Sequence, residues 1–242
     1  MDAVKHGDVT VSVCDLYGDP HYISFSGATF DFLQNCTYIL VEEQSPKHHL
    51  TILVDNFYCV PGLQGSCVKD VIVKYQNNTA ELSVDYDAVG IQATLNGEKV
   101  QPPFEAEGIR FETTDYEVLI VLPDIRSFVS LSPSFNLVVN LAMENFVNNT
   151  QGQCGVCGGA SCIRRGGKIE DDTCCDKTAY DWVHYDPLKP MCFSAPVDVP
   201  CVMVDPPETT GPPPTCVPNS LCQLLEHPYA SRYTQKCSVR KV

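Results

Sequence analysis

The sequence predicts an all-β protein: an antiparallel β-sandwich with a disulfide-rich C-terminal extension. Three observations support this prediction. Short runs rich in Val, Ile, Leu, Phe and Tyr recur between residues 49 and 141, and several alternate with polar residues. Turn-forming pairs such as Asn77-Asn78 and Pro123-Asp124 separate these runs. The 14 cysteines are unevenly spread, with four before residue 68 and ten after residue 153.

The strands are expected in the long interval that lacks cysteine. Leu95-Asn96-Gly97-Glu98 is the clearest hairpin, because Asn-Gly readily adopts the positive φ angles of a type I′ turn. Repeated short strands at this spacing are typical of an antiparallel sandwich. The expected strands are 49–55, 68–75, 80–86, 91–95, 116–122, 128–131 and 135–141.

The chain is expected to divide into four parts. Residues 1–10 form an N-terminal tail and residues 11–195 form the main domain, whose last part from residue 152 is rich in Gly and Cys. Residues 196–215 are interpreted as an extended linker, because seven prolines fall between positions 195 and 215. Residues 216–242 are too few for a domain and are interpreted as the start of a further module.

Charge and cysteine content narrow the classes of function. The 30 acidic and 16 basic residues give a formal charge of -14, which would repel nucleic acids and anionic lipid surfaces. No apolar run approaches the roughly 20 residues of a membrane helix, so membrane insertion is not expected. The cysteines and three Asn-x-Thr sequons, at Asn35, Asn77 and Asn148, favour a secreted glycoprotein. Because residues 1–13 hold no apolar signal segment, we expect an internal piece of a longer secreted chain.

Two cysteine motifs allow more than one interpretation. Cys154-Gly-Val-Cys157 has the spacing of a redox pair or of half a zinc site. No βαβ pattern surrounds it and no second pair has ligand spacing, so structural disulfides are favoured over disulfide-exchange catalysis. Adjacent cysteines cannot easily bond to each other, so Cys174 and Cys175 are expected to have different partners.

Other candidate sites have simpler explanations. His48 and His49 would point to opposite faces of a strand and are interpreted as solvated loop residues. The Glu170-Asp171-Asp172 run lacks the alternating ligands and Gly of a calcium loop and is interpreted as a solvated turn. The sequence has no Gly-x-Ser-x-Gly, phosphate-loop or His-Glu-x-x-His motif. We therefore expect no turnover enzyme, no cofactor and no bound metal.

The segment Gly18-Asp19-Pro20-His21 has distinctive chemistry. The Asp19 carboxyl can attack its own backbone carbonyl, and the Pro20 nitrogen is a relatively good leaving group. An imidazole, which titrates near ~6.5, can donate a proton to that nitrogen as the pH falls, and Gly18 lets the backbone bend. The bonds Asp186-Pro187 and Asp205-Pro206 lack the flanking Gly and His. From the residues alone, a turn that enters the first strand is the alternative interpretation.

The same region resembles the opening of a von Willebrand factor type D domain. The resemblance covers about residues 10 to 195, and Leu221 to Leu225 after Cys216 resembles the start of the eight-cysteine module that usually follows. The residues that carry it are Cys14, Gly18 to Tyr22, Phe25, Gly27, Phe30, Asn35 to Tyr38 and Leu40, and later Cys154, Cys157, Trp182, Asp186-Pro187 and Cys192.

Within this family, Asn35 to Glu43 and Asp55 to Cys59 look most like the fourth D domain of gel-forming mucins. That resemblance implies a structural module of a secreted polymer whose subunits are joined by disulfides. In such mucins Gly-Asp-Pro-His is a site of autocatalytic cleavage at mildly acid pH. It implies roles for Asp19 as nucleophile, Pro20 as leaving group, His21 as proton donor and Gly18 as hinge. The alternative is a non-cleaving interaction module of the same fold.

The resemblance also implies disulfides and a lost calcium site. We expect the pairs Cys14–Cys157, Cys36–Cys192 and Cys59–Cys67. Relatives often have another cysteine where this chain has Gln44 and Ser45, so Cys154 is expected to pair elsewhere, with Cys162, Cys174 or Cys175 among the candidates. Many D domains bind calcium through an Asp where this chain has Ser26, and through a loop that here carries Arg164 and Arg165. We therefore predict no calcium at that site.

Overall fold

The computed structural model describes residues 5–6, 9–59, 62, 65–85, 90–194 and 199–201. The chain divides into two units, residues 1–201 and 202–242, and the second unit lies outside the described residues. The expected eight-cysteine module and most of the expected linker therefore stay predictions.

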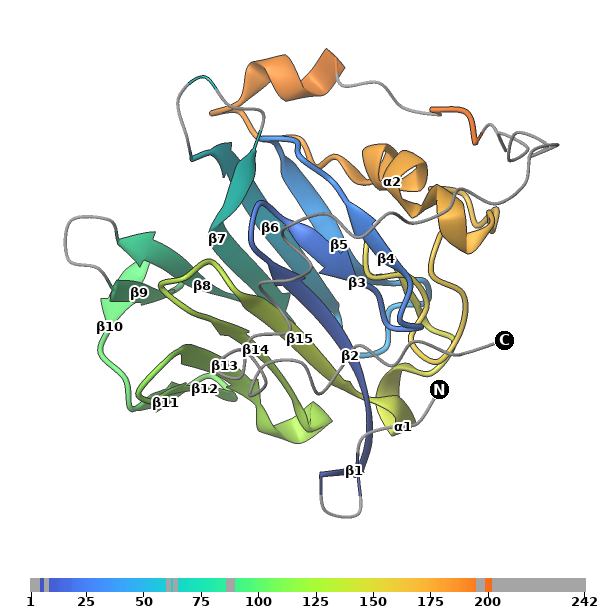
Figure 1. Cartoon of the computed structure of the whole chain (residues 1–242). Coiled ribbons are helices and arrows are strands. Elements are labelled where there is room, and N and C mark those ends of the chain that lie inside the picture. The colour runs from blue at the N-terminus through green and yellow to red at the C-terminus, as the bar shows by residue number, and fades with distance from the viewer. Residues whose placement is uncertain are drawn as a thin grey trace, which may run out of the picture. The chain divides into compact units, whose positions relative to one another are not determined.

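One antiparallel sheet of the described residues contains nine strands, in the order β11-β12-β13-β14-β15-β2-β3-β4, with β1 paired to β2 (Figure 1). The N-terminal strand β2 thus lies inside the sheet, between β15 and β3. The strands are β1 Lys5–His6, β2 Val9–Tyr17, β3 His21–Ile23, β4 Thr29–Asp31, β11 Phe104–Ala106, β12 Ile109–Thr113, β13 Val118–Leu122, β14 Ser127–Leu131 and β15 Leu137–Ala142.

The other sheet contains seven strands in the order β10-β9-β8-β7-β6-β5-β16, again all antiparallel. Asn96 and Gly97 form the turn between β9 and β10, as predicted, because Glu98 pairs with Leu95. The strands are β5 Thr37–Glu43, β6 Leu50–Tyr58, β7 Ser66–Tyr75, β8 Asn78–Asp85, β9 Gly90–Leu95, β10 Glu98–Val100 and β16 Thr150–Gln151.

Helical structure in the described residues is limited to single turns. α2 and η3 pack beside β4 and β5, at the end of the sandwich where β2 turns into β3 (Figure 1). The helical segments are η1 Pro123–Ile125, α1 Met143–Phe146, η2 Asp172–Cys174, α2 Cys175–Thr178, η3 Ala179–Trp182 and η4 Pro190–Ser194.

The core lies between the two sheets. Alternate residues of β8 are buried, at Ala80, Leu82 and Val84, while the residues between them are partly exposed. β13 follows the same period of two. One continuous cluster of buried side chains joins residues of both sheets. The prediction of an all-β sandwich is confirmed, because the two inner faces share one core.

The seven expected strands correspond to β6, β7, β8, β9, β13, β14 and β15, with differences at their starts. His49, Gln76 and Phe135 have positive φ angles and lie in turns before β6, β8 and β15. Tyr116 is 82% exposed and precedes β13, which begins at Val118. Strands β1 to β5, β10 to β12 and β16 were not among the expected strands. Of these, β3, β4, β10 and β11 have only three residues, which are too few to reveal a period of two.

Five disulfides join the described residues. They are Cys14–Cys154, Cys36–Cys192, Cys59–Cys67, Cys162–Cys175 and Cys174–Cys201. Cys36–Cys192 and Cys59–Cys67 are the pairs that the resemblance implied. Cys174 and Cys175 each bond a different partner, as their adjacency predicted.

The expected pair Cys14–Cys157 is wrong, and Cys154 has a different partner from those expected for it. The backbone of Cys154 donates to Leu40 O and accepts from Phe25 N, which places its Cα 5.7 Å from that of Cys14. Cys157 is held elsewhere, because its amide donates to Thr150 Oγ1 at 2.7 Å. Its thiol is buried and has no disulfide partner among the described residues.

Candidate functional site

The predicted cleavage segment forms the tip of the β2–β3 hairpin. Tyr17 pairs with His21, so Gly18, Asp19 and Pro20 make a three-residue turn. Gly18 has φ +70°, and a Cβ at this position would lie 3.0 Å from the His21 ring. Glycine therefore serves both the left-handed backbone and the close approach of the imidazole.

His21 lies between two carboxylates, one facing each ring nitrogen. Its Nδ1 is 2.5 Å from Asp31 Oδ1, and its Nε2 is 3.2 Å from Asp19 Oδ1. Asp31 comes from β4, in the register position directly opposite His21. The sheet thus assembles a chain of three side chains, Asp19–His21–Asp31, from a turn and two neighbouring strands.

The carboxylates favour the charged imidazole. The hydrogen bond to Asp31 is the main cause that raises the pKa of His21 above its ordinary value, and the negative charges of Asp31 and Asp19 add to it. Partial burial of the ring acts in the opposite direction. His21 is therefore more protonated near neutral pH than an isolated histidine would be.

The site is open to water on its carboxylate side and anchored on its proline side. The side chains of Asp19, His21 and Asp31 are 62, 42 and 65% exposed. Pro20, by contrast, is buried, and its carbonyl faces the amide of Phe32 at 3.4 Å. The scissile bond predicted from the sequence thus joins an exposed residue to an anchored one.

The structure brings Gly18, Asp19, Pro20 and His21 together at one turn. The sequence reasoning missed Asp31, which contacts His21 more closely than Asp19 does. The β3–β4 hairpin, whose loop is residues 24–28, places residue 31 opposite residue 21, so only the correct register of this hairpin could have indicated Asp31.

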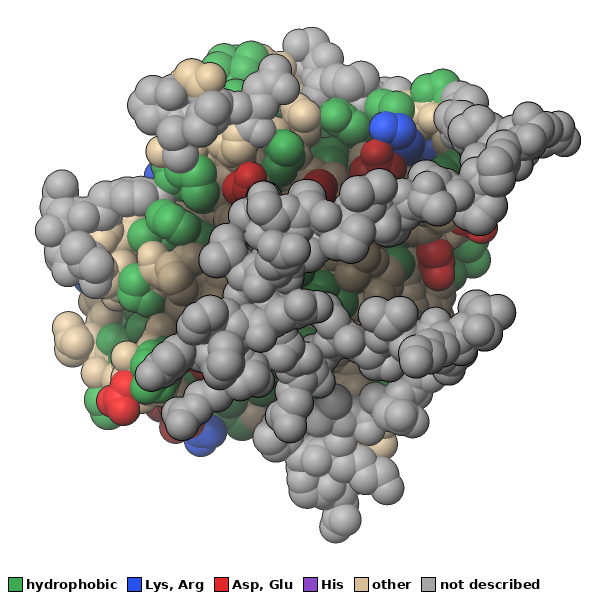
Figure 2. Space-filling view, in the orientation of Figure 1, with side chains coloured by type: hydrophobic (Ala, Val, Ile, Leu, Met, Phe, Trp, Pro, Cys, Tyr) green, Lys and Arg blue, Asp and Glu red, His purple; other side chains and the backbone are tan. Residues whose placement is uncertain are grey.

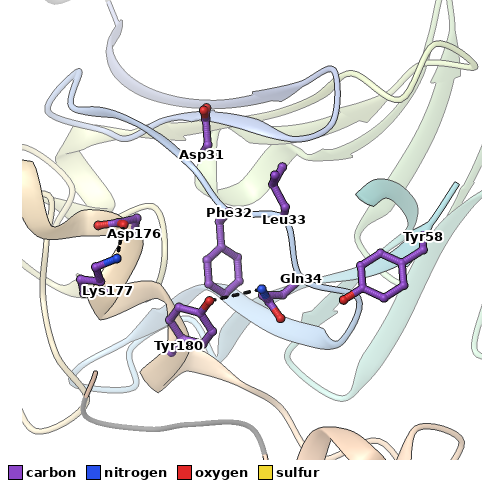
Figure 3. Close-up of a pocket in the computed structure, with 8 residues that line it drawn as sticks. All are labelled: Asp31, Phe32, Leu33, Gln34, Tyr58, Asp176, Lys177 and Tyr180. Atoms are coloured by element: carbon purple, nitrogen blue, oxygen red, sulfur yellow. Dashed lines mark hydrogen bonds and ion pairs between the residues drawn. The ribbon is translucent and has the colours of Figure 1, made fainter. Parts of the chain in front are cut away.

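A pocket of about 320 Å³ lies beside Asp31, between β4 and the α2–η3 segment. Figure 3 shows that its polar groups largely pair with one another. Gln34 Nε2 donates to Tyr180 OH at 3.2 Å, and Lys177 Nζ lies 2.8 Å from Asp176 Oδ2. The lining residues are Asp31, Phe32, Leu33, Gln34, Tyr58, Asp176, Lys177 and Tyr180.

The positions expected to have lost calcium ligands carry hydroxyl groups and a buried cation. Ser24 Oγ lies 2.7 Å from Ser161 Oγ and 3.4 Å from Ser26 Oγ. The buried Arg164 guanidinium faces Asp181 and Glu170, each at 3.2 Å. In the part of the chain that the structure describes, no group of three or more His, Cys, Asp or Glu side chains could hold a metal ion.

Arg165 and Glu170 have structural contacts. Arg165 stacks over Trp182 with its Cζ 5.4 Å from the ring centroid, and its Nε donates to Asp181 O. Glu170 was expected in a solvated turn, but it accepts from Lys168 and Arg164, and these contacts lower its pKa. Glu170, the first residue of the Glu170-Asp171-Asp172 run, therefore helps to hold Arg164 in place.

His48 also differs from expectation. Its ring is partly buried and packs 5.4 Å from Phe146, whereas His49 is exposed. The interpretation of both as solvated loop residues is correct only for His49. The short loop before β6 folds back, because the His48 amide donates to the Glu43 carboxylate.

In the Cys154-x-x-Cys157 motif, Cys154 is part of a disulfide and Cys157 is a buried thiol. Burial raises the pKa of the Cys157 thiol to about 11, which disfavours the reactive thiolate. Cys154 is fully buried in its bond to Cys14. This geometry argues against the alternative of disulfide-exchange catalysis.

The three sequons lie in different surroundings. Asn77 is exposed at the turn between β7 and β8, and Asn148 is exposed after α1 with φ +56°. Asn35 is partly buried, and its backbone carbonyl accepts from Lys189 Nζ at 3.0 Å. Their glycosylation stays a prediction.

The surface agrees with the acidic composition. Acidic side chains outnumber basic ones where described residues are visible on the face shown in Figure 2. Among the described residues, no helix has both the length and the apolar character needed to span a membrane.

Comparisons with known proteins place these features in a family. The family model of the von Willebrand factor type D domain matches residues 14–161. Human Mucin-2 is 32% identical in an alignment 224 residues long that covers 88% of this chain and 4% of Mucin-2. Human Mucin-5AC is 32% identical over 160 residues, 65% of this chain and 3% of that protein.

Chicken (Gallus gallus) Mucin-5B is 28% identical over 176 residues, which cover 70% of this chain and 8% of that mucin. The chain thus spans only 3 to 8% of the length of these three relatives. The hairpin turn and every strand from β3 to β16 lie within residues 14–161. The chain belongs to the von Willebrand factor type D domain family and is homologous to the D domains of mucins.

Proposed function

We propose that this chain is a structural module of a secreted, gel-forming mucin-like glycoprotein and carries an acid-triggered self-cleavage site at the Asp19–Pro20 bond. One observation carries the cleavage proposal: His21 Nε2 lies 3.2 Å from the carboxylate of Asp19. The cleavage is one event per chain, with no turnover.

The reaction uses groups of the turn and one water molecule. An oxygen of the Asp19 carboxylate attacks the Asp19 backbone carbonyl carbon and forms a five-membered ring. The C–N bond to Pro20 breaks, and the nitrogen takes a proton from the His21 imidazolium. The products are a cyclic anhydride and an N-terminal prolyl amine. Water then opens the anhydride to give a C-terminal aspartate, and one released proton can return to His21.

Acid accelerates this reaction through His21. The proton donor is the imidazolium, so its population rises as the pH falls through the pKa of His21, which the two carboxylates raise. The attacking group must stay ionised. The Asp19 side chain is 62% exposed, so its carboxylate is in contact with water.

The structural role rests on the sandwich and its crosslinks. Five disulfides join segments 8 to 156 residues apart and make the first unit a rigid spacer. Polymer assembly with other domains or chains of the same mucin, including a disulfide-linked homo-oligomer of the full-length protein, belongs to this proposal. The proposal also includes location in mucus or the extracellular matrix, and glycans at Asn35, Asn77 and Asn148.

The test is incubation of the folded, disulfide-intact protein at pH values from about 7.5 to 5, followed by reduced and non-reduced denaturing gels. The proposal predicts cleavage at Asp19–Pro20 that accelerates with acid and is absent in Asp19→Ala. A folded protein that stays intact at every pH would instead support a non-cleaving interaction module of the same fold.

A further inference from the structure

We propose that Asp31 is the positioning residue of the self-cleavage site: its carboxylate holds Nδ1 of His21 so that Nε2–H faces Asp19. This inference rests on the proposed function and assigns a residue outside the Gly-Asp-Pro-His segment to the reaction. It acts through His21 and touches neither the scissile carbonyl nor the proline nitrogen.

The fold fixes this contact through strand register. His21 begins β3 and Asp31 ends β4, and the two residues are directly opposite in the antiparallel pair. The pairs Tyr22–Phe30 and Ile23–Thr29 continue the same register. Because Tyr22 and Phe30 stack with ring centroids 4.8 Å apart, the neighbouring pair is held in register by packing.

The contact decides which nitrogen serves the reaction. Asp31 Oδ1 lies 2.5 Å from Nδ1, so that nitrogen carries a proton in both the neutral and the charged ring. Nε2 is then the nitrogen that gains and loses a proton with pH. It lies on the side of Asp19, at 3.2 Å from the carboxylate. Without Asp31, the ring would be free to rotate or to adopt the other tautomer.

The groups that face His21 come from three elements. Asp19 lies in the turn, Asp31 lies on β4, and the Tyr17 ring of β2 lies 5.3 Å from the imidazole centroid. Of these, Asp31 is the strongest cause of the raised His21 pKa. Replacing Asp31 by a neutral residue therefore lowers that pKa and shifts the acid trigger to lower pH.

Asp31 is also suited to a clean test. Its side chain is 65% exposed, so its replacement removes no core contact. Asp176 lines the same pocket and is ion-paired with Lys177 (Figure 3), and it is not among the groups that shift the pKa of His21. Asp176→Asn changes the net charge by the same amount and is the matched control.

The experiment measures the cleavage rate against pH in the intact chain, for the unmodified protein and three variants. Asp31→Asn should slow cleavage about 10-fold or more at pH 6 and shift the profile to lower pH. Asp31→Glu should recover part of the rate, and Asp176→Asn should match the unmodified protein. Equal profiles for Asp31→Asn and the unmodified protein would overturn the inference and leave the proposed function intact.

A second measurement separates the inference from the cleavage itself. In the non-cleaving Asp19→Asn background, the His21 pKa is measured by NMR titration with and without Asp31→Asn. The inference predicts that Asp31→Asn lowers the His21 pKa and leaves that of His184 unchanged in the same spectra. An unchanged His21 pKa overturns it. An unmodified protein that never cleaves refutes the proposed function, and with it a positioning role.

Discussion

Cys14 is bonded to Cys154, a residue 140 positions later in the chain and three residues after the end of β16. β2 therefore carries a covalent anchor only five residues before the proposed scissile bond. It also pairs with β15 over six residue pairs, from Leu16–Leu137 to Val11–Ala142. Both connections lie on the N-terminal side of Asp19 and are unaffected by its cleavage.

Cleaved protein should therefore stay in one piece until it is reduced. We expect a single band on non-reduced denaturing gels after acid incubation, and release of residues 1–19 only after reduction. The reason is that the Cys14–Cys154 bond survives denaturation, whereas strand pairing does not. Release of the N-terminal fragment without reductant would contradict this disulfide assignment.

Replacement of His21 tests the proton donor. His21→Gln should lower the cleavage rate about 100-fold, within the range that general acids contribute. The remaining cleavage should lose its rise between pH 7.5 and 6, because no imidazole titrates at the site. His49→Gln is the control, since His49 is exposed in the loop before β6. The cleavage rate is followed by intact mass at each pH. If His21 had no role, His21→Gln would have the same pH profile as the unmodified protein.

Arg164 should be important for stability. Arg164→Met leaves Asp181, whose side chain is only 4% exposed, without the guanidinium that faces it. We expect a loss of about 3 kcal/mol in the free energy of unfolding, measured by denaturant titration. Arg126→Met is the matched control, because its pair with Glu144 is on the surface and should be worth about 0–1 kcal/mol. Similar losses in both variants would refute this role.

Cys157 should be protected in the folded protein. Its thiol is buried and its pKa is raised to about 11, so alkylation at pH 8 should be slow until the chain is unfolded. Peptide mapping after iodoacetamide treatment, with and without guanidinium, measures this. Rapid labelling in the folded state, or a disulfide to Cys157 in fragment spectra, would contradict the assignment.

Much of the fold could be predicted because hydrophobic periodicity is local. β8 and β13 alternate buried and exposed residues along the chain, so their sequences reveal them as strands. The Asn96-Gly97 turn is likewise specified by its own residues. The starts of β6 and β15 were misplaced, because His49 and Phe135 adopt positive φ angles that their residue types do not predict.

The contacts of the site depended on longer-range geometry. The sequence indicated Asp19 and His21 because they are neighbours, but it did not indicate Asp31, which reaches His21 through the register of β3 and β4. Cysteine pairing has the same limit. Cys154 and Cys157 are three residues apart, and only the backbone contacts of Cys154 with Leu40 and Phe25 decide which of them meets Cys14.

The most direct test compares the three Asp–Pro bonds of one molecule. The folded protein is held at pH 5.5 and then reduced, and its intact mass is followed with time. We predict products of residues 1–19 and 20–242, with the Asp186–Pro187 and Asp205–Pro206 bonds uncut. We do not expect Asp186 to attack its own carbonyl, because its carboxylate accepts hydrogen bonds from Leu188 N and Thr37 Oγ1. An intact chain, or equal cleavage at all three bonds, would contradict a self-cleaving turn.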